Sequence, residues 1–184
     1  MAVTVKQVTA AFELLYERLL DRTYAKSAGF ERYSERELAH IVRAFLLGYF
    51  RKLDPEATSR LPGSPTAYGR IDFVVGNVAI ELAVRSRTAT TKSALSARSN
   101  ITEVKKLLCH KGPAILILFD FARSRLSAED LGLYRTLPSL GPGRLQKSAF
   151  NLAYFHRDGR PAECQLIRMN IRPGASGRPV KLAA

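Results

Sequence analysis

A pair of β-rich runs around Gly76-Asn77 constrains this chain more than any other feature. The runs read IDFVV and VAIELAV, and Gly-Asn suits a two-residue turn, so the segment predicts a tight antiparallel hairpin. Counting outward from the turn places Asp72 directly opposite Glu81. Directly opposed side chains have Cβ atoms about 4.5–5.5 Å apart, and like charges placed so repel each other unless a cation lies between them. The hairpin therefore predicts paired carboxylates that suit a divalent metal.

The two faces of this predicted hairpin differ in polarity. One face carries only apolar side chains and is expected to be core, while the carboxylate face is mixed and is expected to open on a cleft or on solvent. The apolar face comprises Ile71, Phe73, Val75, Val78, Ile80, Leu82 and Val84, and the carboxylate face comprises Arg70, Asp72, Val74, Ala79, Glu81, Ala83 and Arg85.

Helices and further strands are expected on both sides of the hairpin. Capping-box patterns and apolar residues at helical spacing predict helices over residues 5–22 and after Ser34, whose box partner is Glu37. A capping pattern at Asn100 precedes a predicted helix over 101–110, and 114–120 is an apolar run typical of a strand buried on both faces. A loop with a short edge strand is expected over 57–69, a helix over 127–137 and a second antiparallel hairpin over 149–171. The prediction is thus one α/β domain over 1–172 with an N-terminal helical extension, followed by a basic flexible tail over 173–184.

The charge of the chain indicates what it binds. Its 184 residues include 29 Lys and Arg against 16 Asp and Glu, a net charge of +13, so a polyanion such as nucleic acid is the expected partner. A basic or merely solubilising surface is the alternative. No apolar run approaches the roughly 18 residues that a membrane span requires, so no membrane partner is expected. Cys109 and Cys164 form no CxxC pair, which favours a reducing, cytoplasmic setting.

The segment from Gly69 to Val75, followed by Ala79-Ile80-Glu81-Leu82-Ala83, resembles the core of the PD-(D/E)XK nucleases. The resemblance implies a restriction-endonuclease-like αβββαβ core, a central mixed sheet flanked by helices, here with an extra C-terminal β-hairpin. It also implies hydrolysis of DNA phosphodiester bonds with Mg²⁺ or Mn²⁺ as cofactor. The metal ligands implied are Asp72, Glu81 and, from the leading helix, Glu37. For Glu37 a plain capping role is the alternative.

Ala83 occupies the position where this family carries its lysine. Arg85, two residues further along the same face, is the predicted third catalytic residue beside Asp72 and Glu81, and Arg70 could fill the same space from the opposite strand. An arginine cannot act as a base, because its pKa exceeds about 12. Lys105 or Lys106 on the following helix is a second candidate. The alternative function is a catalytically inactive nucleic-acid-binding or adaptor module of the same fold.

Basic residues after the hairpin are expected to contact the phosphate backbone, because the segment lacks acids before Glu103. A solvated loop is the alternative, as are weak surface salt bridges for the two acids. The predicted contacts are Arg70, Arg85, Arg87, Lys92, Arg98, Lys105 and Lys106. Nucleases that cut both strands often need two active sites, so a homodimer or a larger nucleoprotein complex is also considered.

Overall fold

The computed structural model describes residues 2–21, 23–24, 28–141, 147–158 and 163–173. Its helices are α1 (Val5–Leu20), α3 (Glu35–Phe50), α4 (Ile101–Cys109) and α5 (Ala128–Gly132), and short 3-10 turns cover Phe30–Arg32, Ser93–Leu95 and Leu133–Arg135. Its strands are β1 (Asp54–Arg60), β2 (Tyr68–Val75), β3 (Val78–Arg85), β4 (Ala114–Asp120), β5 (Phe150–Asp158) and β6 (Glu163–Ile171).

The strands form a six-stranded mixed sheet in the order β1-β2-β3-β4-β5-β6. β2 runs antiparallel to both β1 and β3, β3, β4 and β5 run parallel, and β6 returns antiparallel to β5 at the edge. The α/β class with a mixed central sheet and a C-terminal hairpin is therefore confirmed. The predicted tail lies almost wholly outside the described residues.

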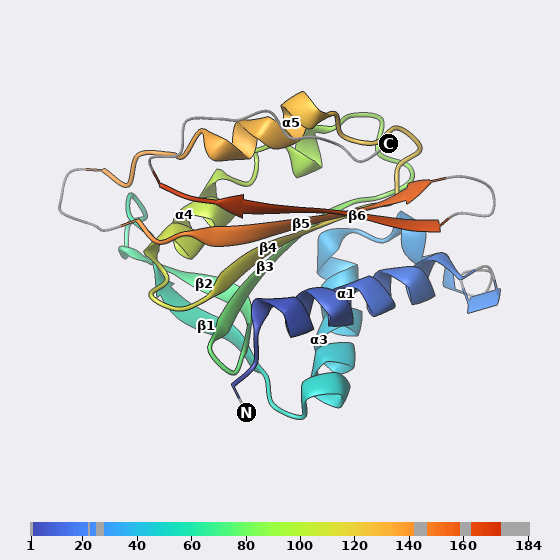
Figure 1. The fold of residues 1–184 in the computed structure, drawn as a ribbon, viewed down its shortest axis with the longest axis horizontal. Coiled ribbons are helices and arrows are strands. Elements are labelled where there is room, and N and C mark those ends of the chain that lie inside the picture. Colours follow the sequence, from blue (N-terminus) through green and yellow to red (C-terminus); the bar gives the residue numbers. More distant parts are fainter. Residues whose placement is uncertain (1, 22, 25–27, 142–146, 159–162, 174–184) are drawn as a thin grey trace.

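Helices cover both faces of the sheet, so the molecule has three layers (Figure 1). On one face α1 packs over β4, β5 and β6, where Phe12 contacts Phe119, and α3 packs over β3 and buries Val42 in the same core. On the other face α4 and α5 enclose a second core with Leu107 and Leu131. Each helix directs its apolar stripe at the sheet, because only that face can be removed from water.

The second core corrects the prediction that the carboxylate face of the hairpin is open. Glu81 and Arg85 on this face are 0% and 1% exposed, and Ala83 is equally buried. Ile71, expected in the first core, packs in the second. Sequence alternation separated the two faces of β3, but it could not show that a helix covers the more polar one.

The inner part of the hairpin register is confirmed, whereas the cap at Asn100 and the length of the helix after Ser127 differ from the prediction. The hairpin register is as predicted from Val75 opposite Val78 to Phe73 opposite Ile80, but the pairing ends there, before Asp72 and Glu81. Asn100 makes no capping hydrogen bond. Its side chain instead donates to the carbonyls of Ala94 and Ser96 and to the Tyr134 hydroxyl, each at 3.0 Å. The helix expected over 127–137 is the short α5 followed by a 3-10 turn.

Candidate active site

The carboxylates of Asp72 and Glu81 lie close together where β2 separates from β3. The paired register between these strands extends from the turn to Phe73 and Ile80. Beyond that point the Asp72 carboxylate accepts a hydrogen bond from the Leu82 amide at 2.8 Å. The charge of Asp72 is also a main cause of the raised pKa of Glu81. The structure therefore brings together the two acids that the hairpin arithmetic singled out.

Lys106 of α4 supplies the ammonium group that β3 lacks. Its Nζ lies 2.8 Å from Glu81 Oε2 and donates to the Arg70 carbonyl at 2.7 Å. Lys106 is 6% exposed, and Ala83 on the strand beneath is 1% exposed. Lys105 points elsewhere, because its Nζ lies near Gly63 in the loop between β1 and β2. Of the two helix lysines considered from the sequence, Lys106 is the one that reaches the site.

Glu81 has one carboxylate oxygen that nothing satisfies. Oε1 is buried and has no hydrogen-bond partner among the described residues. Burial, followed by the charge of Asp72, raises the pKa of Glu81 to about 9, although Lys106 acts in the opposite direction. Burial also raises the pKa of Asp72, against the hydrogen bond from Leu82. A buried carboxylate with a free oxygen and an elevated pKa binds either a proton or a cation.

A third acid, Glu35, comes from the first turn of α3. Desolvation, then the charges of Asp72 and Glu103, raise the pKa of Glu35 to about 7, while Lys106 lowers it. Glu37, the acid proposed from the sequence, is instead occupied by the capping box: its Oε2 accepts from the Ser34 amide and hydroxyl at 2.7 Å. These bonds lower the pKa of Glu37. Two positions along a helix turn a side chain by about 200°, so the structure does not support Glu37 as a ligand and brings Glu35 close to Asp72 and Lys106.

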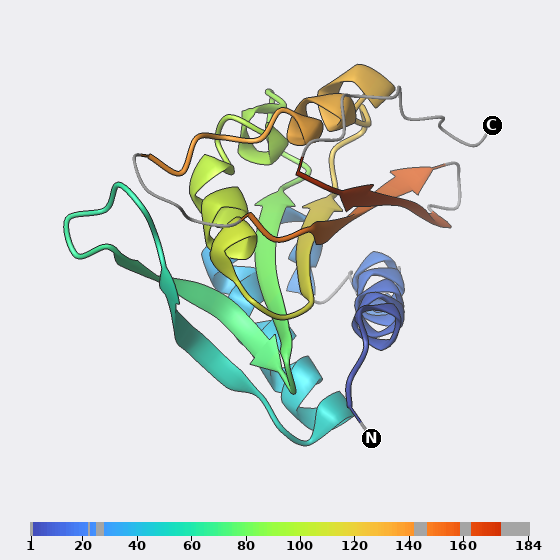
Figure 2. The ribbon, with the colours of Figure 1, turned by 60° about the vertical axis from the view of Figure 1, so that its left-hand side comes forward.

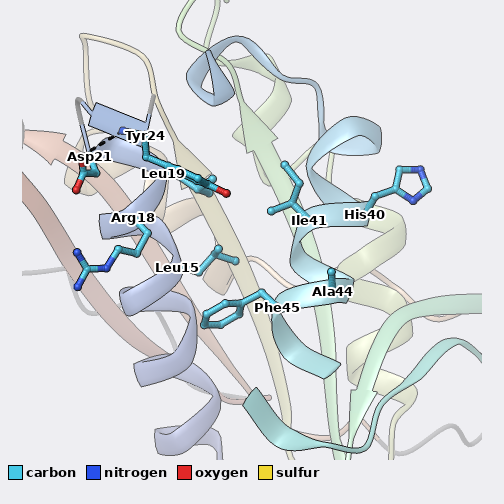
Figure 3. Close-up of a pocket in the computed structure, with 9 residues that line it drawn as sticks. All are labelled: Leu15, Arg18, Leu19, Asp21, Tyr24, His40, Ile41, Ala44 and Phe45. Atoms are coloured by element: carbon cyan, nitrogen blue, oxygen red, sulfur yellow. Dashed lines mark hydrogen bonds between the residues drawn. The ribbon is translucent and has the colours of Figure 1, made fainter. Parts of the chain in front are cut away.

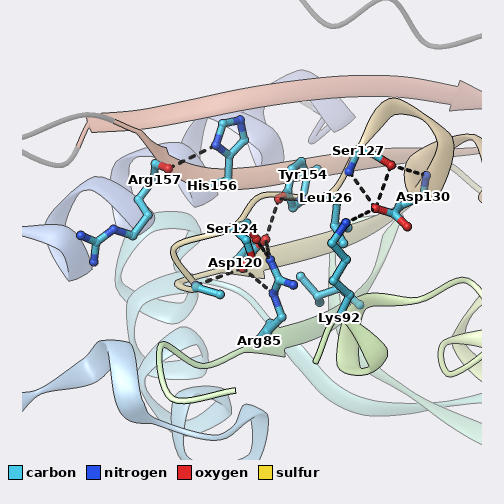
Figure 4. A network of polar contacts seen from close by, with 12 residues as sticks. Arg85, Lys92, Asp120, Ser124, Leu126, Ser127, Asp130, Tyr154, His156 and Arg157 are labelled. Atoms are coloured by element: carbon cyan, nitrogen blue, oxygen red, sulfur yellow. Dashed lines mark hydrogen bonds and ion pairs between the residues drawn. The ribbon is translucent and has the colours of Figure 1, made fainter. Parts of the chain in front are cut away.

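Arg85 is held inside the protein and cannot serve as the predicted catalytic or phosphate-binding arginine. Its Nε and Nη2 donate to the two carboxylate oxygens of Asp120 at 2.7 and 2.5 Å (Figure 4). Nη2 also contacts the Ser124 carbonyl, and the Tyr154 hydroxyl donates to Asp120 at 2.5 Å. Asp120 lies directly opposite Arg85 on the parallel strand β4. The pair thus joins two central strands instead of facing a substrate.

The other predicted phosphate contacts mostly have acidic partners. Arg70 pairs with Glu56, Arg87 pairs with Glu31, and Lys92 pairs with Asp130 at 2.7 Å (Figure 4). The segment itself contains no acid before Glu103, but acids from distant parts of the chain pair with two of its cations. Within the described residues, Arg98 and Lys105 form no ion pair of 4 Å or less. The exposed pairs are weak, however, and their cations can exchange carboxylate for phosphate.

A separate apolar groove of about 720 Å³ lies between α1 and α3 (Figure 3). Leu15, Ile41 and Phe45 face the groove, whereas Arg18 and His40 point away from it. The groove is mostly apolar, and its described lining also includes Asp21 and Tyr24. In the part of the chain that the structure describes, no helix is long and apolar enough to cross a membrane. Within the same residues, no three His, Cys, Asp or Glu side chains gather in a metal-binding arrangement.

Comparison with known proteins gives no relative from which the site can be interpreted. No protein-family model matches the chain, and neither the curated proteins nor the solved structures include a match. The functional argument therefore depends on the geometry of the chain itself.

Proposed function

We propose that this protein is a metal-dependent nuclease of the PD-(D/E)XK type that cleaves DNA phosphodiester bonds. One observation carries the proposal: Lys106 of α4 meets Asp72 and Glu81 of the β2–β3 hairpin in one partly buried cluster. The run α3, β1–β3, α4 and β4 also follows the helix, three strands, helix, strand order of the restriction-endonuclease-like core. The lysine approaches from α4, and Ala83 leaves the strand position vacant.

The donor set fits Mg²⁺ or Mn²⁺. Mg²⁺ keeps several waters and is usually held by only one or two carboxylates together with substrate phosphates, so a cluster of three protein ligands is not required. Asp72 and the free Oε1 of Glu81 would hold the ion. When bound, the metal supplies a Lewis acid for the phosphate oxygen and lowers the pKa of a water molecule.

The surrounding residues have distinct roles in this proposal. The Lys106 ammonium, fixed by Glu81 and the Arg70 carbonyl, stabilises the negative charge that develops on the phosphate. Glu35, with its pKa of about 7, accepts a proton from the attacking water at neutral pH. Exposed cations such as Arg98 and Lys105 position the DNA. A reducing, cytoplasmic setting and assembly as a homodimer or in a nucleoprotein complex belong to the same proposal.

A catalytically inactive DNA-binding module is the second candidate. The observation that favours it is the Glu81–Lys106 ion pair, which lets the acid and the lysine satisfy each other without a metal. Both groups are almost fully buried, so metal binding must rearrange or share this contact.

Adjacent lysines of α4 offer a matched test. Labelled duplex, single-stranded and branched DNA would be incubated with wild type, Lys106→Met and Lys105→Met in Mg²⁺, Mn²⁺ or chelator. We expect metal-dependent cleavage that falls about 100-fold or more in Lys106→Met, because a charge-stabilising donor is removed. Lys105→Met should cleave nearly as wild type when the DNA is saturating, because Lys105 contributes to DNA binding and not to the charge at the cleaved bond. Salt-sensitive binding without cleavage in wild type would instead establish the binding module, and equal losses in both variants would refute the role of Lys106.

A further inference from the structure

The outer half of the β1–β2 hairpin presents an exposed face next to the site. This hairpin projects beyond the rest of the sheet (Figure 2). Arg60 lies opposite Tyr68, and Thr58 lies opposite Arg70, and all four residues are exposed. The other face is covered, because a Cβ on Gly69 would lie 3.4 Å from the Lys106 side chain of α4. The exposed face therefore combines two guanidinium groups, a hydroxyl and an aromatic ring.

This face leads directly to the carboxylates. Alternate residues of a strand share a face, so Tyr68 and Arg70 lie side by side. Asp72 continues their row along β2 at the point where the alternation changes, since Ile71 packs in the second core and Phe73 in the first, and it lies about 13 Å along the strand from Tyr68. The electrostatic influence of Glu56 on Asp72 agrees with this row, since Glu56 is also the ion-pair partner of Arg70. A few nucleotides of extended strand span the row. A strand bound along it would place its backbone at Asp72.

The tyrosine is held in place before any ligand binds. Its carbonyl accepts hydrogen bonds from the Ser64 and Thr66 hydroxyls, both at 3.1 Å, and the Leu61 amide donates to the Ala67 carbonyl at 3.0 Å. The ring itself is 54% exposed. A fixed backbone under an exposed ring reduces the entropy lost on binding. The surface is thus built to present an aromatic face to solvent.

We infer that this face, defined by Thr58, Arg60, Tyr68 and Arg70, binds single-stranded DNA by stacking Tyr68 on an unpaired base while Arg60 and Arg70 contact phosphates. Aromatic rings interleaved with basic side chains bind single strands in this way, whereas a duplex hides its base faces. The Arg70–Glu56 pair is more than half exposed on both side chains, so phosphate can replace the carboxylate. The inference rests on the proposed function in one respect: if the protein is a nuclease, its substrate has unpaired nucleotides next to the cleaved bond.

The test measures binding in chelator, where cleavage plays no part. A labelled single strand and the matching duplex would be titrated by fluorescence anisotropy, and a strand containing 2-aminopurine would report stacking. We expect preference for the single strand, and Tyr68→Ala should weaken its binding about tenfold and remove the 2-aminopurine response. Tyr68→Phe should bind within about twofold of wild type, because the ring face is retained.

Tyr49→Ala is the matched control, since Tyr49 is 50% exposed near the end of α3. It lies about 20 Å along that helix from Glu35 and should leave binding unchanged. Unchanged binding by Tyr68→Ala, equal loss in Tyr49→Ala, or preference for the duplex would overturn the inference. Tyr68-dependent binding by a protein that never cleaves would refute the nuclease alone. Cleavage that is equally fast in Tyr68→Ala and on DNA without unpaired bases would refute the single-strand site alone.

Discussion

Replacing Arg85 by methionine tests whether this arginine serves the fold or the substrate. Arg85 and Asp120 are 1% and 0% exposed and share a bidentate contact at 2.7 and 2.5 Å. Methionine fills similar length without the charge, so it leaves the Asp120 carboxylate buried with only the Tyr154 hydroxyl and the Ala122 amide as donors. Removing one partner of a buried pair typically costs about 3–5 kcal/mol, because the remaining charge is uncompensated.

That loss is a large share of the stability of a domain this size. Total stabilities lie near 5–15 kcal/mol, and for 150–250 residues each kcal/mol shifts the unfolding temperature by about 2–4 °C. Arg85→Met is therefore expected to unfold roughly 6–20 °C below wild type. The unfolding temperature of Arg85→Lys should lie between those of Arg85→Met and wild type, since an ammonium group keeps the charge but cannot make the bidentate contact.

Thermal and urea unfolding measure the effect, with Arg70→Met as the control for loss of an arginine. The Arg70–Glu56 pair is exposed, so this control should change stability by less than about 1 kcal/mol. The reasoning fails if Arg85→Met unfolds at the same temperature as wild type and instead binds DNA more weakly. That result would return Arg85 to the phosphate-contact role predicted from the sequence.

Three further predictions concern the carboxylates and the lysine. Glu35→Gln should abolish most cleavage with little change in unfolding temperature. Glu37→Ala should lower the unfolding temperature and keep cleavage, because Glu37 only caps α3. If the two variants show the reverse pattern in cleavage and unfolding assays, Glu37 is the ligand. The pKa values of Glu35 and Glu81 are raised from 4.5 to about 7 and about 9, so the metal-free fold binds more protons than the unfolded chain and should lose stability as pH rises from about 5 to 9. Unfolding temperatures measured in chelator across this pH range check the prediction, and Glu81→Gln should make the unfolding temperature less dependent on pH. Added Mg²⁺ should stabilise the folded protein more at high pH, because the ion takes the place of a proton on the carboxylates. In Lys106→Met, the added change Ala83→Lys should restore part of the cleavage seen in a gel assay, and a well-folded double variant without any recovery would contradict the shared role of the two positions.

Much of the candidate site follows from local sequence rules. The Gly76-Asn77 turn fixes the register, and period-two alternation then assigns Asp72 and Glu81 to one face. These rules act over a few residues, so a sequence contains all the information they need. The apolar run over β4 is predicted for the same reason, since a strand buried on both faces has no polar alternation.

The errors arise where a distant residue decides the outcome. Arg85 was assigned to the substrate because it follows Ala83 on the carboxylate face and the segment after it lacks acids, yet Asp120 lies beside it on β4 after a whole helix has intervened. Lys92 and Arg87 find their acids on α5 and in the 3-10 turn before α3 in the same way. Ion pairs between residues far apart in the sequence produce no periodic pattern from which they could be predicted.

Under the proposed function, Lys106 takes the role of the motif lysine that β3 lacks. A lysine on β3 at position 83 would start from a backbone buried beneath α4, and Ala83 leaves room there for the helix to pack closely. From α4 the ammonium still reaches Glu81 Oε2 at 2.8 Å, and the Arg70 carbonyl fixes its position from the neighbouring strand. The stabilisation of a phosphate depends on where the positive charge lies, and not on whether a strand or a helix carries it. A search along one strand therefore misses a lysine that the three-dimensional cluster retains, and the cluster, not the strand motif, is the better criterion for this site.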